Sequence, residues 1–155
     1  MDARLDYSSP LAAKVVKHIV SASTVAGSGL PTTTLELMQM RISQINGCAV
    51  CVDMHTKDAA AHGESAVRIN LVSAWREATV FTEAERAALA LAEEGTRIAD
   101  AATGVSDEVW ANAANHYDEE QLAALVCTIA LMNSWNRLNV ITQQPAGDYV
   151  PGQWN

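Results

Sequence analysis

The sequence predicts an all-α protein of about seven helices, folded as a single domain over residues 1–155. Alanine and leucine are plentiful and runs of β-branched residues are few, a composition typical of helical proteins. Apolar residues recur at helical spacing, and no stretch shows the alternation of a convincing strand. A chain of 155 residues with 49% hydrophobic content is also long enough to bury one sizeable core.

The sequence pattern predicts three helices between residues 10 and 63. The first covers residues 10–22 and begins with Pro10, which is favourable in a first turn. A glycine- and serine-containing loop follows over 25–31, and a threonine is expected to cap the second helix within Pro31–Thr34. Asn46-Gly47 signals a turn, and a third helix runs from about Cys48 to His62, ended by Gly63. The first two helices are expected to turn inward Leu11, Val15, Val16 and Ile19, and Leu35, Met38, Ile42 and Ile45.

The remaining chain predicts four more helices and an irregular tail. They cover residues 65–77, a segment beginning at Thr82 with a Thr82/Glu85 capping box, residues 106–116 behind a Ser106 cap, and about 118–140. Cys127 lies in the apolar last helix and is expected to be buried and inert. The tail, residues 141–155, carries Trp154, which suggests contact with a neighbouring subunit. Inward residues are expected to be Val67, Leu71, Trp75, Leu89, Leu91 and Ile98.

Charge and hydropathy exclude several classes of protein. A net charge of −8 without a basic patch argues against nucleic acid or an anionic membrane as the partner. No apolar run reaches the roughly 20 residues that span a bilayer. The first seven residues lack the basic start and apolar block of a signal peptide, so we expect a cytoplasmic protein. Three cysteines do not make a disulfide scaffold, and in a reducing compartment a Cys-x-x-Cys pair indicates redox chemistry or metal.

The stretch from Glu36 to His55 carries the candidate site. On one helix Cys48, Cys51 and His55 stand at i, i+3 and i+7 and share a side. Glu36 would lie about 18 Å from Cys48 if the helix were continuous. A fold-back at Asn46-Gly47 instead makes two antiparallel helices, which we expect to bring Glu36 roughly opposite His55, with the cysteines nearer the turn.

These residue types permit thiol redox chemistry. The helix N-terminus favours a thiolate, and Cys51 in the first turn gains most from it. His55, four residues on, can exchange a proton with Cys51, while Glu36 would orient the imidazole and favour its protonated form. A thiolate can reduce a peroxide to give a sulfenic acid, which the second cysteine converts to a disulfide. The spacing predicts a Cys48–Cys51 link without Cys127, and an external dithiol restores the pair.

The motif resembles the alkylhydroperoxidase D-like branch of the carboxymuconolactone decarboxylase family. The resemblance depends on Glu36, eleven residues, Cys48-x-x-Cys51, three residues and His55, and it extends over about residues 30–140. One position departs from the pattern: Val50 stands where the best-characterised members have a second histidine, which shortens the implied relay.

The resemblance implies an all-α fold with the site on a helical hairpin, and thiol-dependent reduction of organic hydroperoxides. It implies Cys51 as the peroxidatic cysteine, Cys48 as the resolving one, and Glu36 with His55 as a proton relay. It also implies no bound cofactor, a thiol or dithiol reductant of the lipoyl or thioredoxin type, and a trimer or hexamer. Family members that decarboxylate the lactone lack the dithiol, so that reaction is disfavoured here.

Other interpretations remain open at this stage. Zinc on Cys48, Cys51 and His55 would need a fourth ligand, and His62 is about 21 Å along the helix from Cys48. His62 is therefore expected to favour the helix C-terminus, with a role in a pocket as the alternative. The acidic runs Glu93-Glu94 and 118–120 are expected to be solvated. The chain could also be a thiol–disulfide oxidoreductase that passes electrons between proteins, or a non-catalytic helical assembly protein.

Overall fold

A computed structural model describes residues 2–154 and confirms the all-α prediction. Within this range there are seven α-helices and no strand. Their bounds are α1 Pro10–Gly27, α2 Thr32–Asn46, α3 Ala49–Ala61, α4 Ala66–Leu71, α5 Glu83–Thr96, α6 Asp107–His116 and α7 Glu119–Thr142, with short 3₁₀ helices at Val72–Ala74 and Ile98–Asp100. None of these helices is both long and apolar enough to cross a bilayer.

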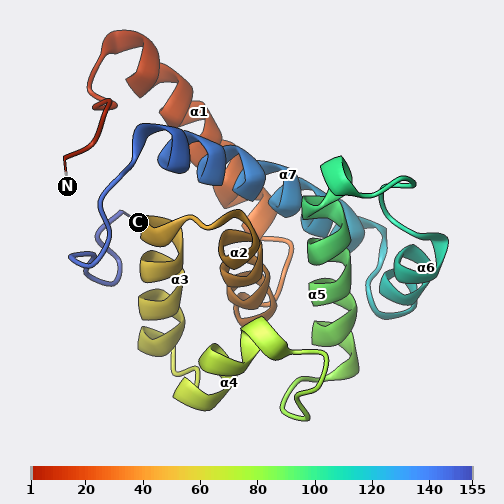
Figure 1. Cartoon of the computed structure of the whole chain (residues 1–155). Coiled ribbons are helices and arrows are strands. Elements are labelled where there is room, and N and C mark those ends of the chain that lie inside the picture. The colour runs from red at the N-terminus through yellow and green to blue at the C-terminus, as the bar shows by residue number, and fades with distance from the viewer. Residues whose placement is uncertain (1, 155) are drawn as a thin grey trace.

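Helix α2 is the centre of the molecule. It stands between α3 and α5 and packs on α7, as Figure 1 shows. Because it has neighbours on several sides, four of its apolar side chains are fully buried on more than one face of the helix rather than along one stripe: Leu37, Met38, Met40 and Ile42. Leu35 and Ile45 are partly buried. Met38 and Ile42 join a core with α5, α6 and α7, and Leu37 and Met40 join a second core with α3, α4 and α5. Helix α3, which carries the motif, is thus held on a rigid support.

The turn between α2 and α3 is tight and follows the sequence signal. Gly47 adopts a left-handed conformation with φ 66°, which a side chain would strain. Its N–H bonds to the carbonyls of Gln44 and Ser43, and the next N–H, that of Cys48, also bonds to Ser43 at 3.0 Å. Cys48 is then the extended N-cap of α3, and Cys51 is its third residue. The predicted hairpin is confirmed.

Several predicted helix ends are also confirmed. Thr82 and Glu85 form the capping box of α5, and the Ser106 hydroxyl caps α6. Asp118 caps α7 and makes a second capping box with Gln121. These short-range signals succeed because each side chain satisfies backbone groups of its own helix end.

The predictions for α1, α2 and α4 need correction. Helix α1 runs to Gly27, and its Leu11 and Val15 are exposed, because α1 packs mainly on α7 and its N-terminal half extends past the other helices (Figure 1). Pro31, not a threonine, is the N-cap of α2, without a side-chain hydrogen bond. Helix α4 ends at Leu71 and leaves Val67 exposed, and Ile98 is exposed beyond the end of α5.

Two further predictions are wrong for reasons of tertiary packing. Cys127 is exposed, because α7 turns Leu125 and Ile129 to the core and Cys127 to the opposite side. Glu93 is buried, not solvated, and accepts hydrogen bonds from Arg41 and Arg76 and from the Trp75 indole at 2.9 Å. Three donors from other elements compensate for the loss of water around this carboxylate.

Candidate redox site

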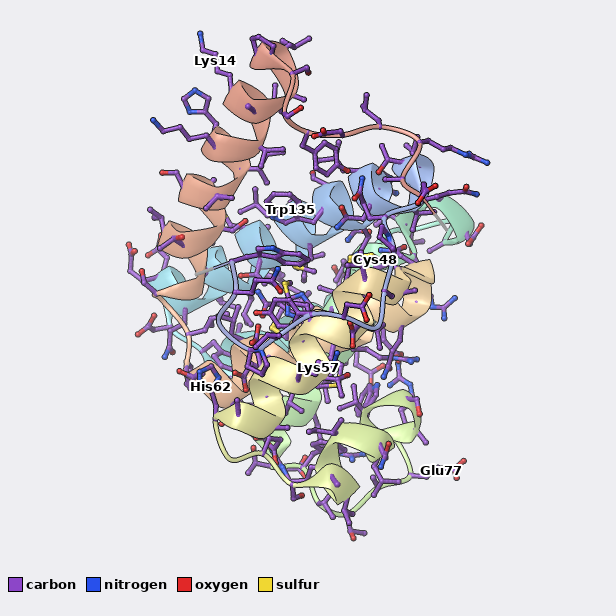
Figure 2. All side chains as sticks on the ribbon, turned by 90° about the vertical axis from the view of Figure 1, so that its left-hand side faces the viewer. Lys14, Cys48, Lys57, His62, Glu77 and Trp135 are labelled. Atoms are coloured by element: carbon purple, nitrogen blue, oxygen red, sulfur yellow. A yellow bond between two sulfur atoms is a disulfide. The ribbon has the colours of Figure 1, made fainter. Side chains whose placement is uncertain are left out.

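Cys48 and Cys51 are joined as a disulfide at the N-terminal end of α3. Their Cα atoms are 5.3 Å apart, and Cys127 is free, as the spacing predicts. Both cysteines are almost fully buried, at 1% and 2% exposure. Figure 2 shows Cys48, Lys57 and His62 following one another along α3. The unpaired N–H groups of the first turn make this end of the helix favourable for a thiolate on Cys51.

An asparagine from α7 contacts the Cys51 sulfur. Asn139 Nδ2 donates to Cys51 Sγ at 3.4 Å, and the Tyr7 hydroxyl donates to Asn139 Oδ1 at 3.3 Å. The Tyr7 hydroxyl oxygen also lies 3.0 Å from Thr142 Oγ1, and the backbone N–H of Arg4 donates to the Thr142 carbonyl. The N-terminal segment therefore lies along the C-terminal end of α7, beside the redox pair.

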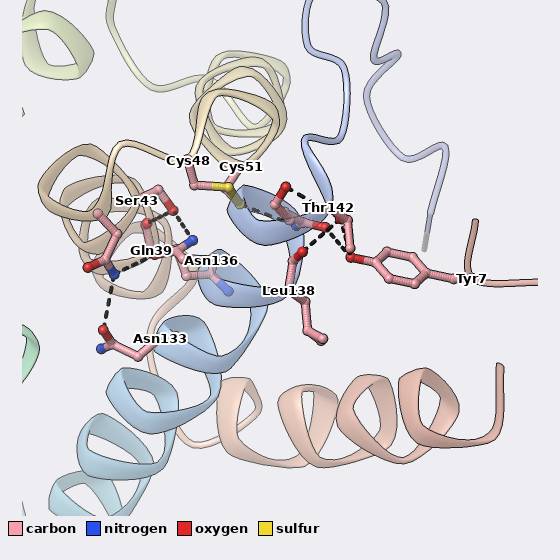
Figure 3. The surroundings of a disulfide bond; sticks show 11 residues. Tyr7, Gln39, Ser43, Cys48, Cys51, Asn133, Asn136, Leu138 and Thr142 are labelled. Atoms are coloured by element: carbon pink, nitrogen blue, oxygen red, sulfur yellow. Dashed lines mark hydrogen bonds between the residues drawn. A yellow bond between two sulfur atoms is a disulfide. The ribbon is translucent and has the colours of Figure 1, made fainter. Parts of the chain in front are cut away.

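Asn139 is the last of three asparagines on one side of α7. Asn46 at the end of α2 donates to both Asn133 and Asn136, and Asn136 donates to the Ser43 hydroxyl at 3.1 Å. Figure 3 shows Ser43, Asn136 and Asn133 on one side of the disulfide and Thr142 with Tyr7 on the other. None of these asparagines was predicted to be near the site. The available signal was Asn-x-x-Asn-x-x-Asn at helical spacing in an apolar helix, which indicates a buried polar row.

His55 lies on the same face of α3 as Cys51, one turn farther along. Its side chain is buried, and residues 2–154 offer its Nε2 atom no hydrogen-bond partner. Burial lowers the pKa of His55 to about 4, and the charge of the Asp58 carboxylate only partly opposes this effect. His55 is therefore neutral at pH 7, contrary to the expected protonated imidazole.

Glu36 is buried, but it does not pair with His55. Its carboxylate bonds to Nδ1 of His62, the C-cap residue of α3, which is exposed. Burial raises the pKa of Glu36 even though the His62 bond opposes the effect. The same hydrogen bond raises the pKa of His62. The expected Glu36–His55 contact is thus replaced by a pair that connects the interior to the surface.

The register of the hairpin explains this correction. Helix α2 ends at Asn46 and α3 begins at Ala49, so the residue level with Glu36 is near Ala59, not His55. Side chains on a helix lean toward its N-terminus, which for Glu36 means away from the turn. The side chain of His62 leans toward the turn, and the two meet.

A hollow of about 600 Å³ lies beside Cys48. Gly47, Ala49 and Val52 line one side, and Ala146 and Gly147 of the C-terminal tail line another. The tail is tied to α3 because Gly147 N–H donates to Asp53 and Lys57 donates to the Gly147 carbonyl (Figure 2). Lys57 also pairs with Asp53 at 2.8 Å, four residues away on the same helix. The hollow offers a route from solvent to the Cys48 side of the pair.

Across residues 2–154, no group of three or more His, Cys, Asp or Glu side chains comes together in a way that could hold a metal ion. His62 is occupied by Glu36 and stands at the far end of α3 from the cysteines. Near the disulfide, a neutral donor, the Asn139 amide, bonds to the Cys51 sulfur.

Comparison with protein families gives a match over just over half of the chain. The sequence model of the carboxymuconolactone decarboxylase family matches residues 13–94. This range contains Glu36, both cysteines and His55. Tyr7 and Asn139 lie outside it.

Two bacterial proteins have similar sequences, and both are uncharacterised. YdfG of Bacillus subtilis is 45% identical over 113 residues, which are 73% of this chain and 76% of YdfG. YnjA of Escherichia coli is 30% identical over 119 residues, 77% of this chain, and the match spans 64% of the length of YnjA.

Solved structures share the fold. A protein of unknown function from Agrobacterium tumefaciens, suggested to be the antioxidant defence protein AhpD, is 36% identical with a TM-score of 0.86 over 96% of this chain and all of that one. The apo form of the debrominase Bmp8 has a TM-score of 0.67 at 23% identity, over 77% of this chain and 62% of Bmp8. At that identity the second likeness concerns the fold alone.

Proposed function

This chain belongs to the carboxymuconolactone decarboxylase family, and on that premise we propose that it is a thiol-dependent peroxidase that reduces organic hydroperoxides through Cys48 and Cys51. The observation that carries the proposal is the buried Cys48–Cys51 disulfide at a helix N-terminus. One turn from Cys51 lies the buried His55, whose Nε2 atom finds no hydrogen-bond partner in the part of the chain that the structure describes. The likeness to the Agrobacterium protein suggested to be AhpD supports the same chemistry.

The proposed reaction oxidises the dithiol by two electrons. The Cys51 thiolate attacks one peroxide oxygen, so that an S–O bond forms, the O–O bond breaks and the alcohol leaves with a proton. Cys51 is then a sulfenic acid. The Cys48 thiolate attacks its sulfur, water leaves, and the disulfide forms.

We assign separate tasks to the acid–base groups. His55 is neutral and stands four residues from Cys51, so it can accept the thiol proton and deliver it to the leaving oxygen. Glu36 is buried but bonded to the exposed His62, so the pair can exchange protons with solvent. The direct Glu36–His55 relay expected from the sequence is not kept, because Glu36 bonds to His62 instead; His55 and the Glu36–His62 pair act separately in the proposal.

Reduction of the disulfide needs an external thiol or dithiol, and no bound cofactor takes part in the proposal. The hollow beside Cys48 favours attack on Cys48 Sγ, since Cys48 lines it and Cys51 does not. A second thiol of the reductant then resolves the mixed disulfide and releases the reduced pair. A lipoyl-type or thioredoxin-type dithiol has the required chemistry.

We also propose that the protein is a homotrimer or homohexamer. Large apolar side chains are exposed on α1 and α7, the two helices that pack along one side of the molecule (Figure 1). The most exposed are Leu11, Val25 and Ile141. Such side chains gathered on neighbouring helices are typical of a subunit contact.

The test is a stopped-flow measurement of thiol loss after reduced protein is mixed with cumene hydroperoxide. We expect Cys51→Ser to be inert, and Cys48→Ser to consume one equivalent and stop at a sulfenic acid that dimedone traps. Cys127→Ser is the matched control and should behave as the unchanged protein. Inertness of Cys48→Ser but not Cys51→Ser would reverse the roles. A protein that ignores peroxide but exchanges disulfides with thioredoxin would instead be a thiol–disulfide oxidoreductase.

A further inference from the structure

The Cys51 sulfur has a neutral donor aimed at it from a distant part of the chain. Asn139 Nδ2 lies 3.4 Å from Cys51 Sγ, across 88 residues of sequence. Asn139 is partly buried near the end of α7, outside the region that matches the family model. This donor is therefore not explained by the Glu36, Cys48, Cys51 and His55 motif.

We propose that Asn139 is a third member of the redox centre, stabilising the Cys51 thiolate that forms when the disulfide opens, and that Tyr7 holds its amide in the required orientation. An N–H group bonds much more strongly to a thiolate than to a disulfide sulfur, because the hydrogen bond becomes charge-assisted. The contact therefore favours the reduced state and the nucleophilic form of Cys51. The inference rests on the proposed redox cycle of Cys48 and Cys51.

Tyr7 contacts the end of the Asn139 amide that faces away from the sulfur. Its hydroxyl donates to Asn139 Oδ1 at 3.3 Å and so leaves Nδ2 for Cys51. Tyr7 is itself held by its contact with Thr142 and by the bond from Gln144 to the carbonyl of Leu5. Tyr7 touches no sulfur in this network and is a positioning residue.

The contact between Asn139 and Cys51 also favours Cys51 as the leaving group when an external dithiol reduces the disulfide. A thiolate of the external dithiol attacks Cys48 Sγ, a bond forms between the two sulfurs, and the Cys48–Cys51 bond breaks. Its electron pair goes to Cys51 Sγ, which leaves as a thiolate on Asn139 and the helix N-terminus. The second thiol of the reductant attacks the mixed disulfide, releases Cys48 as a thiol, and leaves as a cyclic or intramolecular disulfide. Better stabilisation of the leaving thiolate accelerates the first exchange.

Substitution of Asn139 leaves the ionisable groups around Cys51 in place. On α3 these are His55 and the Asp53–Lys57 pair, and on the N-terminal segment Tyr7. Helix α2 presents Ser43 and Gln44 near the pair, and α7 presents asparagines, which carry no charge. A change in the titration of Cys51 is then attributable to the lost donor.

The experiment titrates Cys51 as the single thiol. In a Cys48→Ser, Cys127→Ser background, iodoacetamide alkylation rates and thiolate absorbance at 240 nm are followed from pH 4 to 10. Asn139→Leu should raise the midpoint of Cys51 ionisation by about one pH unit. At any pH below the midpoint, the fraction of Cys51 present as thiolate should then be about tenfold lower. Asn139→Asp, which keeps the shape but replaces the donor with an anion, should move it further. Tyr7→Phe should move it in the same direction by less.

Asn133→Leu is the matched control. Asn133 stands on the same face of the same helix and bonds to Asn46 and Thr96 but to no sulfur. It should change stability and leave the Cys51 midpoint where it was. In the chain with both cysteines, Asn139→Leu should also require a more reducing dithiothreitol buffer to open the disulfide.

An unmoved midpoint in folded Asn139→Leu and Asn139→Asp would overturn the proposal. If Asn139→Leu does not fold, Asn139→Asp and Tyr7→Phe provide the test. The proposal is also overturned if both of these variants have the same Cys51 midpoint as the Cys48→Ser, Cys127→Ser protein. None of these measurements uses peroxide, so a protein that fails to reduce hydroperoxides still gives a clear result for Asn139.

Discussion

Replacing His55 with leucine tests whether a buried imidazole is retained for chemistry. Its Nε2 atom has no partner within residues 2–154, and an unpaired buried polar group costs roughly 1–3 kcal/mol. Leucine has a similar volume and no polar atom, so His55→Leu should be as stable as the unchanged protein at pH 7, or more stable. A residue that lowers stability at a reactive site is best explained by its function.

The pH dependence gives the prediction a magnitude. The pKa of His55 is about 4 in the folded protein and 6.5 in an ordinary setting. Between these values the unfolded chain binds a proton that the folded chain does not, so stability falls as pH is lowered from 6.5 to 4. The difference of about 2.5 pH units corresponds to at most about 3 kcal/mol. His55→Leu should lack this part of the acid sensitivity.

Urea unfolding followed by circular dichroism between pH 4 and 8 measures both effects. His18→Gln, an exposed histidine on α1, is the control and should change neither. In the same variants, the stopped-flow reaction with peroxide should slow about 10²-fold for His55→Leu, at the lower end of general acid–base contributions. The His55→Leu variant should thus be stable but react slowly with peroxide.

Two results would refute the reasoning. A His55→Leu variant that loses more than about 1 kcal/mol at pH 7 and keeps the wild-type acid sensitivity would mean that the imidazole is a satisfied structural group. A variant with the expected stability but an unchanged rate would remove His55 from proton transfer.

Three further predictions concern the Glu36–His62 pair and the assembly. His62→Ala leaves the buried Glu36 carboxylate without its partner and pushes the pKa of Glu36 further up, so the low-pH limb of the peroxide reaction should move to higher pH, with rates on that limb about tenfold lower; a limb that stays in place would remove the pair from the mechanism. Because Glu36 raises the pKa of His62, their bond stabilises the fold below pH 6.5, and this contribution is lost as pH rises through the folded value; in urea unfolding Glu36→Gln should lack this pH-dependent loss. Analytical ultracentrifugation should find a trimer or hexamer at micromolar concentration, and a monomer would contradict the assembly proposed from the exposed side chains of α1 and α7.

Features set by short-range chemistry were predictable from the sequence. Gly47 ends α2 because it accepts a left-handed conformation, and Thr82, Ser106 and Asp118 begin helices because their side chains satisfy nearby N–H groups. The link between Cys48 and Cys51 also follows from sequence spacing, since both lie within one turn of a helix start.

Features set by packing between distant segments were not predictable. Whether α7 turns Cys127 or Leu125 to the core depends on where α2 and α5 lie, and an apolar helix does not specify this. Glu93 is predicted to be solvated because the sequence does not show that Arg41 of α2, and Trp75 and Arg76 of the turn after Val72–Ala74, donate to its carboxylate. Asn139 reaches Cys51 only because α7 crosses the turn between α2 and α3.

The partner of Glu36 depended on a difference of one helical turn. A spacing counted from Asn46-Gly47 predicted His55, while the observed start of α3 at Ala49 and the lean of both side chains select His62. Sequence spacing can identify the residues of such a site more readily than their pairing, because pairing changes with each residue added to the turn.

The loss of the Glu36–His55 contact changes how Cys51 must be activated. With a pKa of about 4, His55 does not hold a positive charge at pH 7, so a thiolate–imidazolium pair is not available to stabilise Cys51. The stabilisation has to come from neutral donors. Two are at hand: the free N–H groups of the first turn of α3 and the Asn139 amide, which Tyr7 orients. On this argument His55 moves the proton, and Asn139 and the helix terminus favour the thiolate, two tasks that a charged histidine would combine.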